Sequence, residues 1–373
     1  MRMMDYKYVG DRAALDEAVE RLGSCRSISV DLESDSYHHY AEKIALVQVC
    51  GEKDIFILDP LSVDLSPLAG LLTDASIEKV FHDADYDGRM LLTFLGVKPS
   101  PVFDTMIAAR ILGKERVGLA DLLGEYFGLE MDKKFQKADW SERPLGGEML
   151  EYAAMDVAYL AALRERLVAE LEGAGRMAWA REEFERLLEA LEPMPERTVD
   201  VSRVKGARDL SPRRLAVLRE LLQWREERAR ERDLPCFKVI GNDRLMGIAR
   251  SCPRSRGQLA ASGILSERQL ARFGADILAA VERGMRTPRG ELPSFLSPPR
   301  QKRDFVAEKI LRELKASRDR KAAELNMDPG FLMPNAVLKA VARLKPADAA
   351  ELEKSGLLKG WRLGIMQEII SGE

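Results

Sequence analysis

The sequence contains little cysteine and no long apolar run. Its four cysteines, Cys25, Cys50, Cys236 and Cys252, are far apart, and none forms a CxxC pair. This spacing argues against a zinc knuckle and a disulfide framework, so we expect a reducing compartment. No stretch of about 18 apolar residues is present, which predicts no transmembrane helix, and the first residues lack the apolar core of a signal peptide. We therefore expect a cytoplasmic protein that does not bind membranes.

Charge is nearly balanced over the whole chain but unevenly distributed along it. The 58 basic and 61 acidic residues give a net charge of -3. Residues 1–200 carry 23 Lys and Arg against 39 Asp and Glu, whereas residues 201–300 carry 21 against 11 and residues 301–373 carry 14 against 11. An acidic half joined to a basic half predicts a metal-using or neutral domain beside a domain that binds anions.

The 373 residues suffice for two or three domains. In the first half, apolar periodicity predicts a mixed sheet covered by helices, an α/β or α+β domain that begins with three antiparallel strands. The expected strands are 27–33, 44–50, 54–58 and 79–82, and the expected helices are 11–22, 66–73, 86–95, 103–112, 119–127 and a long one at 147–171.

The second half is predicted to be wholly helical and internally repeated. A proline-punctuated boundary at 193–212 precedes it. Leu218-Arg219-Glu220-Leu221 recurs as Leu311-Arg312-Glu313-Leu314, and the other matching segments keep an offset close to 93. We therefore expect domains at 1–195, 205–288 and 300–373, with a linker rich in proline, including Pro298 and Pro299, between the last two.

Three acidic motifs carry the chemistry. Asp31 and Glu33 end an apolar strand and are two residues apart, so they point to the same face. Two like charges side by side suggest a divalent cation, although two solvated carboxylates are the simpler alternative. Asp87 follows the strand at 79–82, where Asp83 and Asp85 are expected to cap the next helix. An EF-hand is rejected there because Phe94 occupies the position of the bidentate Glu.

The third motif lies on the helix expected at 147–171. Tyr152 and Asp156 are four residues apart and so share one helix face. Their neighbours are small or apolar, and a buried Asp is costly unless it is paired or bound to metal. A Tyr–Asp hydrogen bond within the core is the alternative.

Taken in order, Asp31, Glu33, Asp87, Tyr152 and Asp156 resemble the DEDD superfamily of 3′→5′ exonucleases, which have a ribonuclease-H-like fold. Tyr152 indicates the tyrosine subclass, because Glu151 stands where the other subclass has histidine. Among its members the chain is most similar to the ribonuclease D family, and the repeated helical units look like HRDC domains. The resemblance also implies substrate contacts, for which the matching residues are Leu32, His82, Trp140 and Arg143. For His82, a packed side chain at the end of a strand is the alternative.

The resemblance implies a 3′→5′ exoribonuclease that releases nucleoside 5′-monophosphates from tRNA precursors and other structured RNAs with 3′ tails; no protein partner is indicated. A DNA exonuclease and a catalytically silent RNA-binding adaptor are the alternatives. Four carboxylates without His or Cys fit two Mg²⁺ or Mn²⁺ ions, which stabilise charge on the attacking and leaving oxygens. Tyr152, with an ordinary pKa near 10, is expected to orient the attacking water. Asp104 is expected to be a helix N-cap.

The basic half suggests a phosphate-binding surface. Arg225, Arg228, Arg230 and Arg232 are close together on one expected helix, and such residues supply affinity that does not depend on base sequence. A solvated helix face is the alternative for any one of them. The second copy has Ser317-Arg318-Asp319-Arg320 near the position of Trp224-Arg225-Glu226-Glu227, so its part in RNA binding is left open.

Overall fold

A computed structural model describes residues 4–52, 54–132, 134–295 and 303–371. Within these ranges the chain forms two compact units. The first unit draws on residues 1–34, 44–194 and 302–373, and the second on residues 35–43 and 195–301. Pro298, Pro299 and the expected domain start at residue 300 lie outside the described residues.

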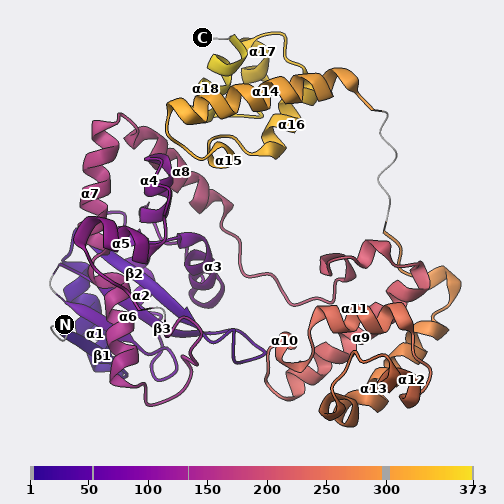
Figure 1. Ribbon diagram of the computed structural model, residues 1–373. Coiled ribbons are helices and arrows are strands. Elements are labelled where there is room, and N and C mark those ends of the chain that lie inside the picture. The colour runs from indigo at the N-terminus through magenta and orange to yellow at the C-terminus, as the bar shows by residue number, and fades with distance from the viewer. Residues whose placement is uncertain (1–3, 53, 133, 296–302, 372–373) are drawn as a thin grey trace. The chain divides into compact units, whose positions relative to one another are not determined.

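A six-stranded mixed sheet forms the centre of the first unit (Figure 1). Its strands are β1 (Tyr6–Val9), β2 (Ser27–Ser34), β3 (Ile44–Cys50), β4 (Ile55–Leu58), β5 (Glu78–Phe81) and β6 (Val102–Asp104). They are arranged in the order β1-β4-β3-β2-β5-β6. The β2–β3 and β3–β4 pairs are antiparallel and the other three pairs are parallel, which confirms the predicted mixed sheet and its antiparallel start.

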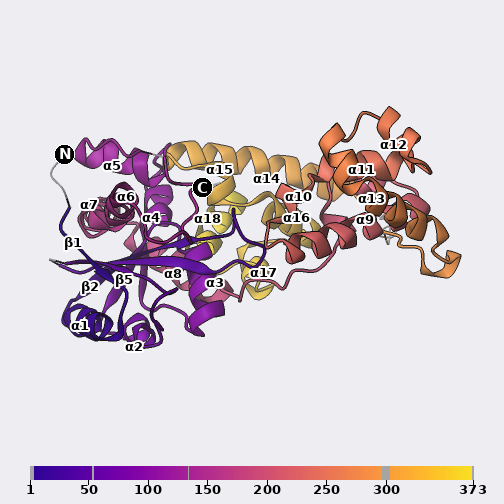
Figure 2. The ribbon, with the colours of Figure 1, turned by 90° about the horizontal axis from the view of Figure 1, so that it is seen from below.

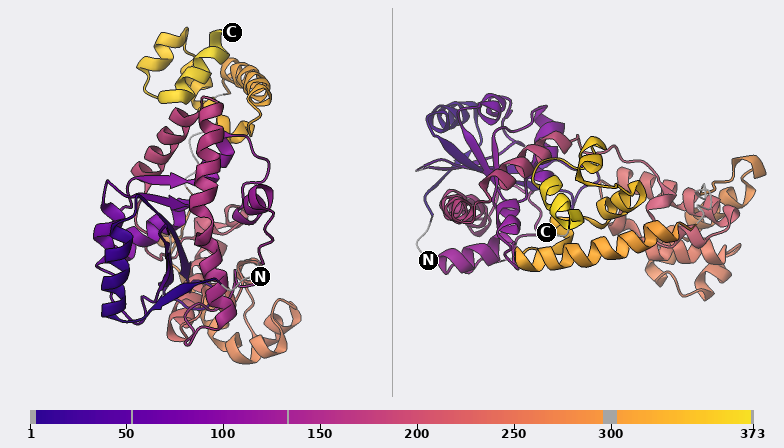
Figure 3. Two further views of the ribbon diagram at one scale, coloured as in Figure 1. Left: turned by 90° about the vertical axis from the view of Figure 1, so that its left-hand side faces the viewer. Right: turned by 90° about the horizontal axis from the view of Figure 1, so that it is seen from above.

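Helices cover both faces of this sheet (Figures 2 and 3). On one face lie α1 (Arg12–Gly23), α2 (Leu68–Thr73) and α3 (Ala84–Leu95). On the other lie α4 (Thr105–Ile111), α5 (Leu119–Phe127), α6 (Gly147–Ala158), α7 (Leu160–Gly173) and α8 (Met177–Ala190).

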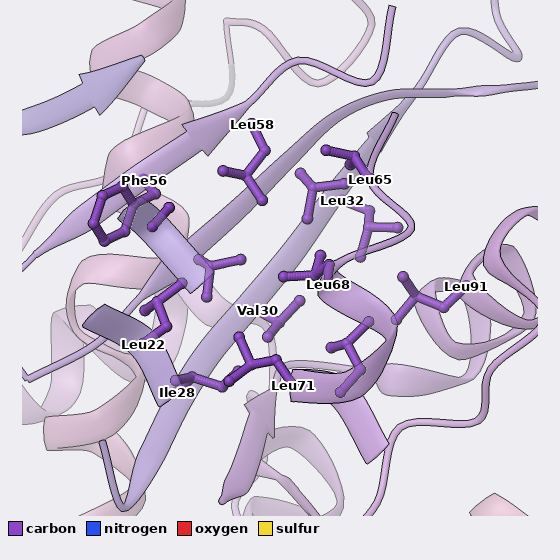
Figure 4. Close-up of a cluster of buried hydrophobic side chains, with 14 of the residues drawn as sticks. Leu22, Ile28, Val30, Leu32, Phe56, Leu58, Leu65, Leu68, Leu71 and Leu91 are labelled. Atoms are coloured by element: carbon purple, nitrogen blue, oxygen red, sulfur yellow. The ribbon is translucent and has the colours of Figure 1, made fainter. Parts of the chain in front are cut away.

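The alternation of side chains along β2 decides which residues enter the core. Ile28, Val30 and Leu32 pack into the apolar cluster beneath α1 and α2 (Figure 4). Asp31 and Glu33, which alternate with these residues along the strand, therefore point to the opposite face of the sheet, which α6 covers. Burying aliphatic side chains here contributes about 1.5–3 kcal/mol each, which fixes the register of β2 and so the direction of its two carboxylates.

The long helix predicted at 147–171 is instead two helices. Tyr159 leaves helical geometry between α6 and α7, with φ of -110° and ψ of -2°. Its ring packs against Phe127 of α5, with 5.9 Å between ring centroids. Tertiary packing thus interrupts a continuous apolar pattern three residues after Asp156. Strand β1 and helix α8 are further elements that the sequence pattern did not predict.

The second unit contains the first helical copy. Its helices are α9 (Pro212–Glu231), α10 (Cys236–Val239), α11 (Asn242–Ser251), α12 (Arg256–Ala261) and α13 (Glu267–Arg286). Helices α9 and α13 cross closely at Gly284, where an added Cβ would lie 2.4 Å from the Cα of Val217. Only glycine allows this approach.

The second helical copy lies in the first unit and repeats the first with an offset of 93. Its helices are α14 (Phe305–Glu324), α15 (Pro329–Leu332), α16 (Asn335–Leu344), α17 (Ala349–Lys354) and α18 (Gly360–Ser371). Even the residues with positive φ recur: Cys252 and Lys345, at 45° and 52°, each follow the third helix of their copy. The predicted internal repeat is therefore present as two copies of one fold.

The second helical copy packs against α8 through a buried polar and aromatic contact. Trp361 stacks on Trp179 with 4.8 Å between centroids and an interplanar angle of 12°. Arg362 pairs with Glu183, which also accepts a 2.9 Å hydrogen bond from Trp361 Nε1. Both charged side chains are about nine-tenths buried, so removing Glu183 would leave the charge of Arg362 without an acidic partner in the interior.

Candidate active site

The first two acidic residues lie at the end of β2. Asp31 pairs with Gln48 and Glu33 with Leu46 across the antiparallel β2–β3 ladder, and the register shifts between Glu33 and Ser34. This irregularity ends the regular pairing directly after the second carboxylate. The strand thus presents Asp31 and Glu33 together where the sheet stops.

Helix α6 brings the third acidic residue to the same place. Ala153 and Ala154 pack against Ala45, Leu46 and Ile57 of the sheet. Their small side chains let the helix lie close to the strands, with Asp156 8% exposed. One carboxylate oxygen each of Asp31, Glu33 and Asp156 lies within 4.8 Å of the others. These three residues form the one group with metal-ligand spacing found among the described residues.

Asp87 completes what we call the carboxylate cluster: Asp31, Glu33, Asp87 and Asp156. It lies in the first turn of α3 and is 7% exposed. Burial raises its pKa well above the ordinary value, and the charge of Asp31 raises it further. The charges of Asp31, Asp87 and Asp156 raise the pKa of Glu33, and the charge of Asp31 raises the pKa of Asp156. The four carboxyl groups therefore interact electrostatically.

Burial and mutual repulsion dominate the titration of this cluster. Burial raises the pKa of Asp31 to about 7, although a hydrogen bond from the Leu32 N–H opposes the shift. The pKa values of Glu33 and Asp156 are also raised well above normal, first by burial and then by neighbouring carboxylates. Four acidic oxygen donors that repel one another make a strong site for hard divalent cations, which prefer oxygen ligands. The residues therefore fit the predicted cofactor.

Tyr152 lies beside the cluster from the same helix as Asp156. Burial and then the charges of Asp156 and Glu33 raise its pKa above the ordinary value near 10. Its ring packs edge-on against Phe135, with 5.8 Å between ring centroids, and tilted against Trp140 at 6.0 Å. The phenol is therefore fixed in position and stays protonated at neutral pH, as a hydrogen-bond donor requires.

Helix α3 is capped differently from the prediction. Asp83 has a φ of 67° and makes no side-chain cap, and Asp85 pairs with Arg89 at 2.9 Å. Instead, Asp104 from β6 accepts the Ala84 N–H at 2.7 Å and also caps its own helix α4 by accepting the Ile107 N–H at 2.9 Å. One buried carboxylate thus fixes the start of two helices, including the turn that carries Asp87.

His82 is a packed side chain at the end of β5. Its Nδ1 lies 2.9 Å from the Thr105 hydroxyl, and its Nε2 is buried. Burial and then the nearby Arg110 charge lower its pKa to about 4. A neutral imidazole at physiological pH cannot supply positive charge to a phosphate.

Three other expected substrate contacts are structural instead. Leu32 belongs to the apolar core on the opposite face of the sheet. Trp140 is 1% exposed and packs against Ala45, Leu46 and Ile57. Arg143 uses every N–H of its guanidinium within the protein. These groups donate to both oxygens of buried Asp59 and to three backbone carbonyls, those of Ala45, Trp140 and Glu142. The expected substrate contacts of these three side chains are therefore corrected.

Arg225 also has a structural role. Its Nη1 donates to the Ile240 carbonyl at 3.2 Å and to Asn242 Oδ1 at 2.7 Å, and burial lowers its pKa. Arg318 repeats these bonds in the second helical copy, to the Met333 carbonyl and to Asn335. An arginine with the same contacts in both copies holds the fold together, so Arg225 is removed from the residues expected to touch phosphate.

Arg228 differs from Arg225 because it lies at the surface. It pairs with Glu231 at 2.6 Å and with Asp276 at 3.1 Å, and a third of its side chain is exposed. Its charge is thus accessible to solvent, although acidic neighbours compete for it.

Asp59 and Tyr86 are residues near these networks that the sequence pattern did not reveal. Asp59 is fully buried and accepts hydrogen bonds from Arg143, Tyr8 and Ser62. The Tyr86 hydroxyl lies 3.0 Å from Ser34 Oγ, next to the last residues of β2. Apart from the Ser62 bond, these contacts join residues more than 50 positions apart, so they leave no local signal in the sequence.

Known proteins place this geometry in a family. A model described as a 3′-5′ exonuclease matches residues 6–172, and a model of the HRDC domain matches residues 214–281 and 307–369. Ribonuclease D of Escherichia coli (strain K12) is 31% identical over 374 residues, covering 98% of each chain. The chain belongs to the ribonuclease D family. The family assignment confirms the predicted 3′→5′ exoribonuclease activity and does not favour the DNA exonuclease or the silent adaptor.

Solved structures agree with the ribonuclease D assignment. The crystal structure of Escherichia coli RNase D, described as an exoribonuclease involved in structured RNA processing, has a TM-score of 0.73 and 27% identity, covering 99% of this chain and 98% of that one. The catalytic core of RRP6 from Trypanosoma brucei has a TM-score of 0.66 and 27% identity, over 75% of this chain and 80% of that one. No described helix is long and apolar enough to cross a membrane.

Proposed function

We propose that this ribonuclease D relative hydrolyses RNA from the 3′ end at the carboxylate cluster with two divalent ions, Mg²⁺ or Mn²⁺. The observation that carries the proposal is the approach of Asp31, Glu33 and Asp156 within 4.8 Å. The charge of Asp31 also acts on buried Asp87, whose pKa it raises. These four residues would hold the ions. When bound, two such ions stabilise charge on the attacking and leaving oxygens of a phosphodiester.

The protein's own groups have distinct tasks in this reaction. Tyr152, held by Phe135 and Trp140, donates a hydrogen bond that orients the attacking water. A phenol whose pKa lies above its ordinary value is a poor general base near neutral pH, which favours the orienting role. Asp104 acts through backbone, because it fixes the helix start that positions Asp87. The products are nucleoside 5′-monophosphates.

The substrates proposed for this activity are tRNA precursors and other structured RNAs with 3′ tails. The first helical copy would hold such RNA through arginines at its surface, the partly exposed Arg228 among them, because residues 201–300 carry 21 basic against 11 acidic residues. We propose domains at 1–195, 205–288 and 300–373 for these tasks.

The test compares RNA and DNA of equal length and sequence with Mg²⁺, Mn²⁺ or EDTA. We expect metal-dependent release of 5′-monophosphates from RNA, abolished by Asp87→Ala. Asp85→Asn is the matched control, since Asp85 lies on the same helix in a surface pair with Arg89. Nucleotide release by Asp87→Ala at the wild-type rate would contradict the proposed role of the cluster.

A further inference from the structure

The loop that follows β2 supplies one ring of an exposed aromatic pair in the second unit, and α10 supplies the other. Tyr37 and Phe237, which we call the aromatic pair, meet edge to face with 5.9 Å between ring centroids and an interplanar angle of 71°. Tyr37 is 47% exposed and Phe237 is 56% exposed. Two large rings left half in water at one place form an apolar surface that is suited to a ligand with flat faces.

The aromatic pair is not what holds the loop in place. His39 Nδ1 lies 2.6 Å from Asp233 Oδ2, and the Tyr40 N–H donates to Asp233 Oδ1 at 3.0 Å. The Tyr40 hydroxyl donates to Glu226 at 2.8 Å, and Arg197 and Arg230 lie over its ring at 5.0 and 5.5 Å. His39 and Tyr40 thus anchor loop 35–43, which leaves Tyr37 for another purpose.

A cationic side chain lies next to the aromatic pair. Lys238 follows Phe237 directly, and its Nζ lies 3.3 Å from Nδ1 of His38, the neighbour of Tyr37. The sequence of residues 201–300, which includes Phe237 and Lys238, has ten more basic than acidic residues. Aromatic faces beside positive charge are the combination that binds single-stranded nucleic acid, since bases stack on the rings while cations attract phosphates.

Chain connectivity links the aromatic pair to the reaction. Tyr37 follows Glu33 by four residues, and four extended residues span at most about 14 Å. A short covalent link therefore joins a stacking surface to the strand that carries two residues of the carboxylate cluster.

We propose that Tyr37 and Phe237 form a stacking site for bases of the single-stranded 3′ segment upstream of the nucleotide being removed. The proposal rests on the proposed function for its substrate. Stacking is indifferent to base identity, so the site would hold any 3′ tail in register without selecting its sequence. These are positioning residues, because they do not touch the reacting atoms.

Binding without catalysis tests the site directly. The full-length protein in EDTA is titrated with a labelled oligouridylate of about 12 nucleotides, a usual length for single-strand binding sites. Tyr37→Ala and Phe237→Ala should each weaken binding about tenfold. Phe94→Ala is the matched control: Phe94 is 44% exposed on α3 and should leave affinity unchanged.

Two further variants separate stacking from packing. Phe237→Leu keeps apolar contact with Tyr37 but removes the flat π face, whereas Phe237→Trp keeps and enlarges that face. Stacking predicts that the Leu variant binds as weakly as Phe237→Ala and that the Trp variant binds like the wild type. Wild-type affinity in the Ala or Leu variant would overturn the proposal and leave the pair as a packing contact.

Hydrolysis in Mg²⁺ distinguishes this proposal from the proposed function. With long RNA, the alanine variants should raise KM about tenfold with kcat unchanged, and with a dinucleotide they should match the wild type. A wild-type protein without metal-dependent hydrolysis would refute the proposed function, whereas the binding result in EDTA would still decide on the aromatic pair.

Discussion

Two networks of buried charge in the first unit are handled in opposite ways. In one, Asp59 is fully buried, yet its pKa is lowered, because hydrogen bonds from Arg143, Tyr8 and Ser62 outweigh the cost of burial. In the carboxylate cluster, burial raises every pKa, and neighbouring acids raise those of Glu33, Asp87 and Asp156 further. Asp59 thus has all the hydrogen-bond donors that it requires within the protein, whereas the carboxylate cluster does not. The contrast therefore supports the proposal that the cluster holds a cation from outside the chain.

The largest expected effect breaks the cluster. Asp156→Asn removes one proposed metal ligand and should lower the rate of RNA hydrolysis at least about 10³-fold, since metal stabilisation of transition-state charge is worth several kcal/mol. The free energy of unfolding without metal should not fall, because the substitution removes a repelling charge. Urea unfolding in EDTA, measured beside activity, checks both; a large loss of stability would contradict the contrast.

Breaking the internally paired network should have the reverse outcome. Arg143→Met leaves Asp59 buried without its cation and should cost about 3–5 kcal/mol of unfolding free energy. Arg143→Met combined with Asp59→Asn should cost less than the sum of the two single variants. Hydrolysis per folded molecule should remain near the wild-type rate. A stable Arg143→Met protein with lost substrate affinity would restore the substrate role first expected of Arg143.

Arg225 and Arg318 are charged side chains whose hydrogen bonds are likewise made within the protein, one in each helical copy. Arg225→Met and Arg318→Met should each destabilise by about 2 kcal/mol, the usual loss for hydrogen bonds from a charged donor. Arg228→Met serves as the control: stability should hold, while the slope of log affinity against log salt should fall by about 0.7 if it meets a phosphate of single-stranded RNA. Equal salt slopes for Arg228→Met and the wild type would exclude that contact.

His82 is a third kind of buried ionisable group, because its imidazole stays neutral at physiological pH. An unfolded histidine binds a proton near pH 6.5, whereas folded His82 does so only near pH 4. Between these values the unfolded state binds more protons, so stability is lost as pH falls, by about 2 kcal/mol at pH 5. Unfolding of His82→Gln at pH 7 and pH 5 should show a smaller pH dependence than the wild type. An identical dependence would mean that other groups account for it.

The sequence predicted the residues of the cluster because short-range spacing controls their direction. Alternation along β2 brings Asp31 and Glu33 to one face, and the helical period does the same for Tyr152 and Asp156 on α6. The repeat at an offset of 93 likewise predicted two helical copies of one fold.

Contacts between segments that are distant in the chain could not be predicted from local sequence patterns. Trp140 and Arg143 were expected to touch substrate, but whether such side chains turn outward depends on buried Asp59 and on the sheet beneath them. Asp104 caps α3 from 20 residues away, where local spacing favoured Asp83. The break at Tyr159 also depends on packing, here against Phe127.

The pairing of Glu183 with Arg362 has a consequence for biosynthesis. The two residues are 179 positions apart, which at about 5–20 residues per second means a wait of roughly 10–40 s during translation. Until α18 has been made, the nascent first unit exposes Trp179 and leaves Glu183 without this arginine. A transcript that ends early would therefore yield a nuclease whose α8 exposes an apolar ring, Trp179, beside an acidic side chain, Glu183. Chaperones and proteases can recognise such a surface.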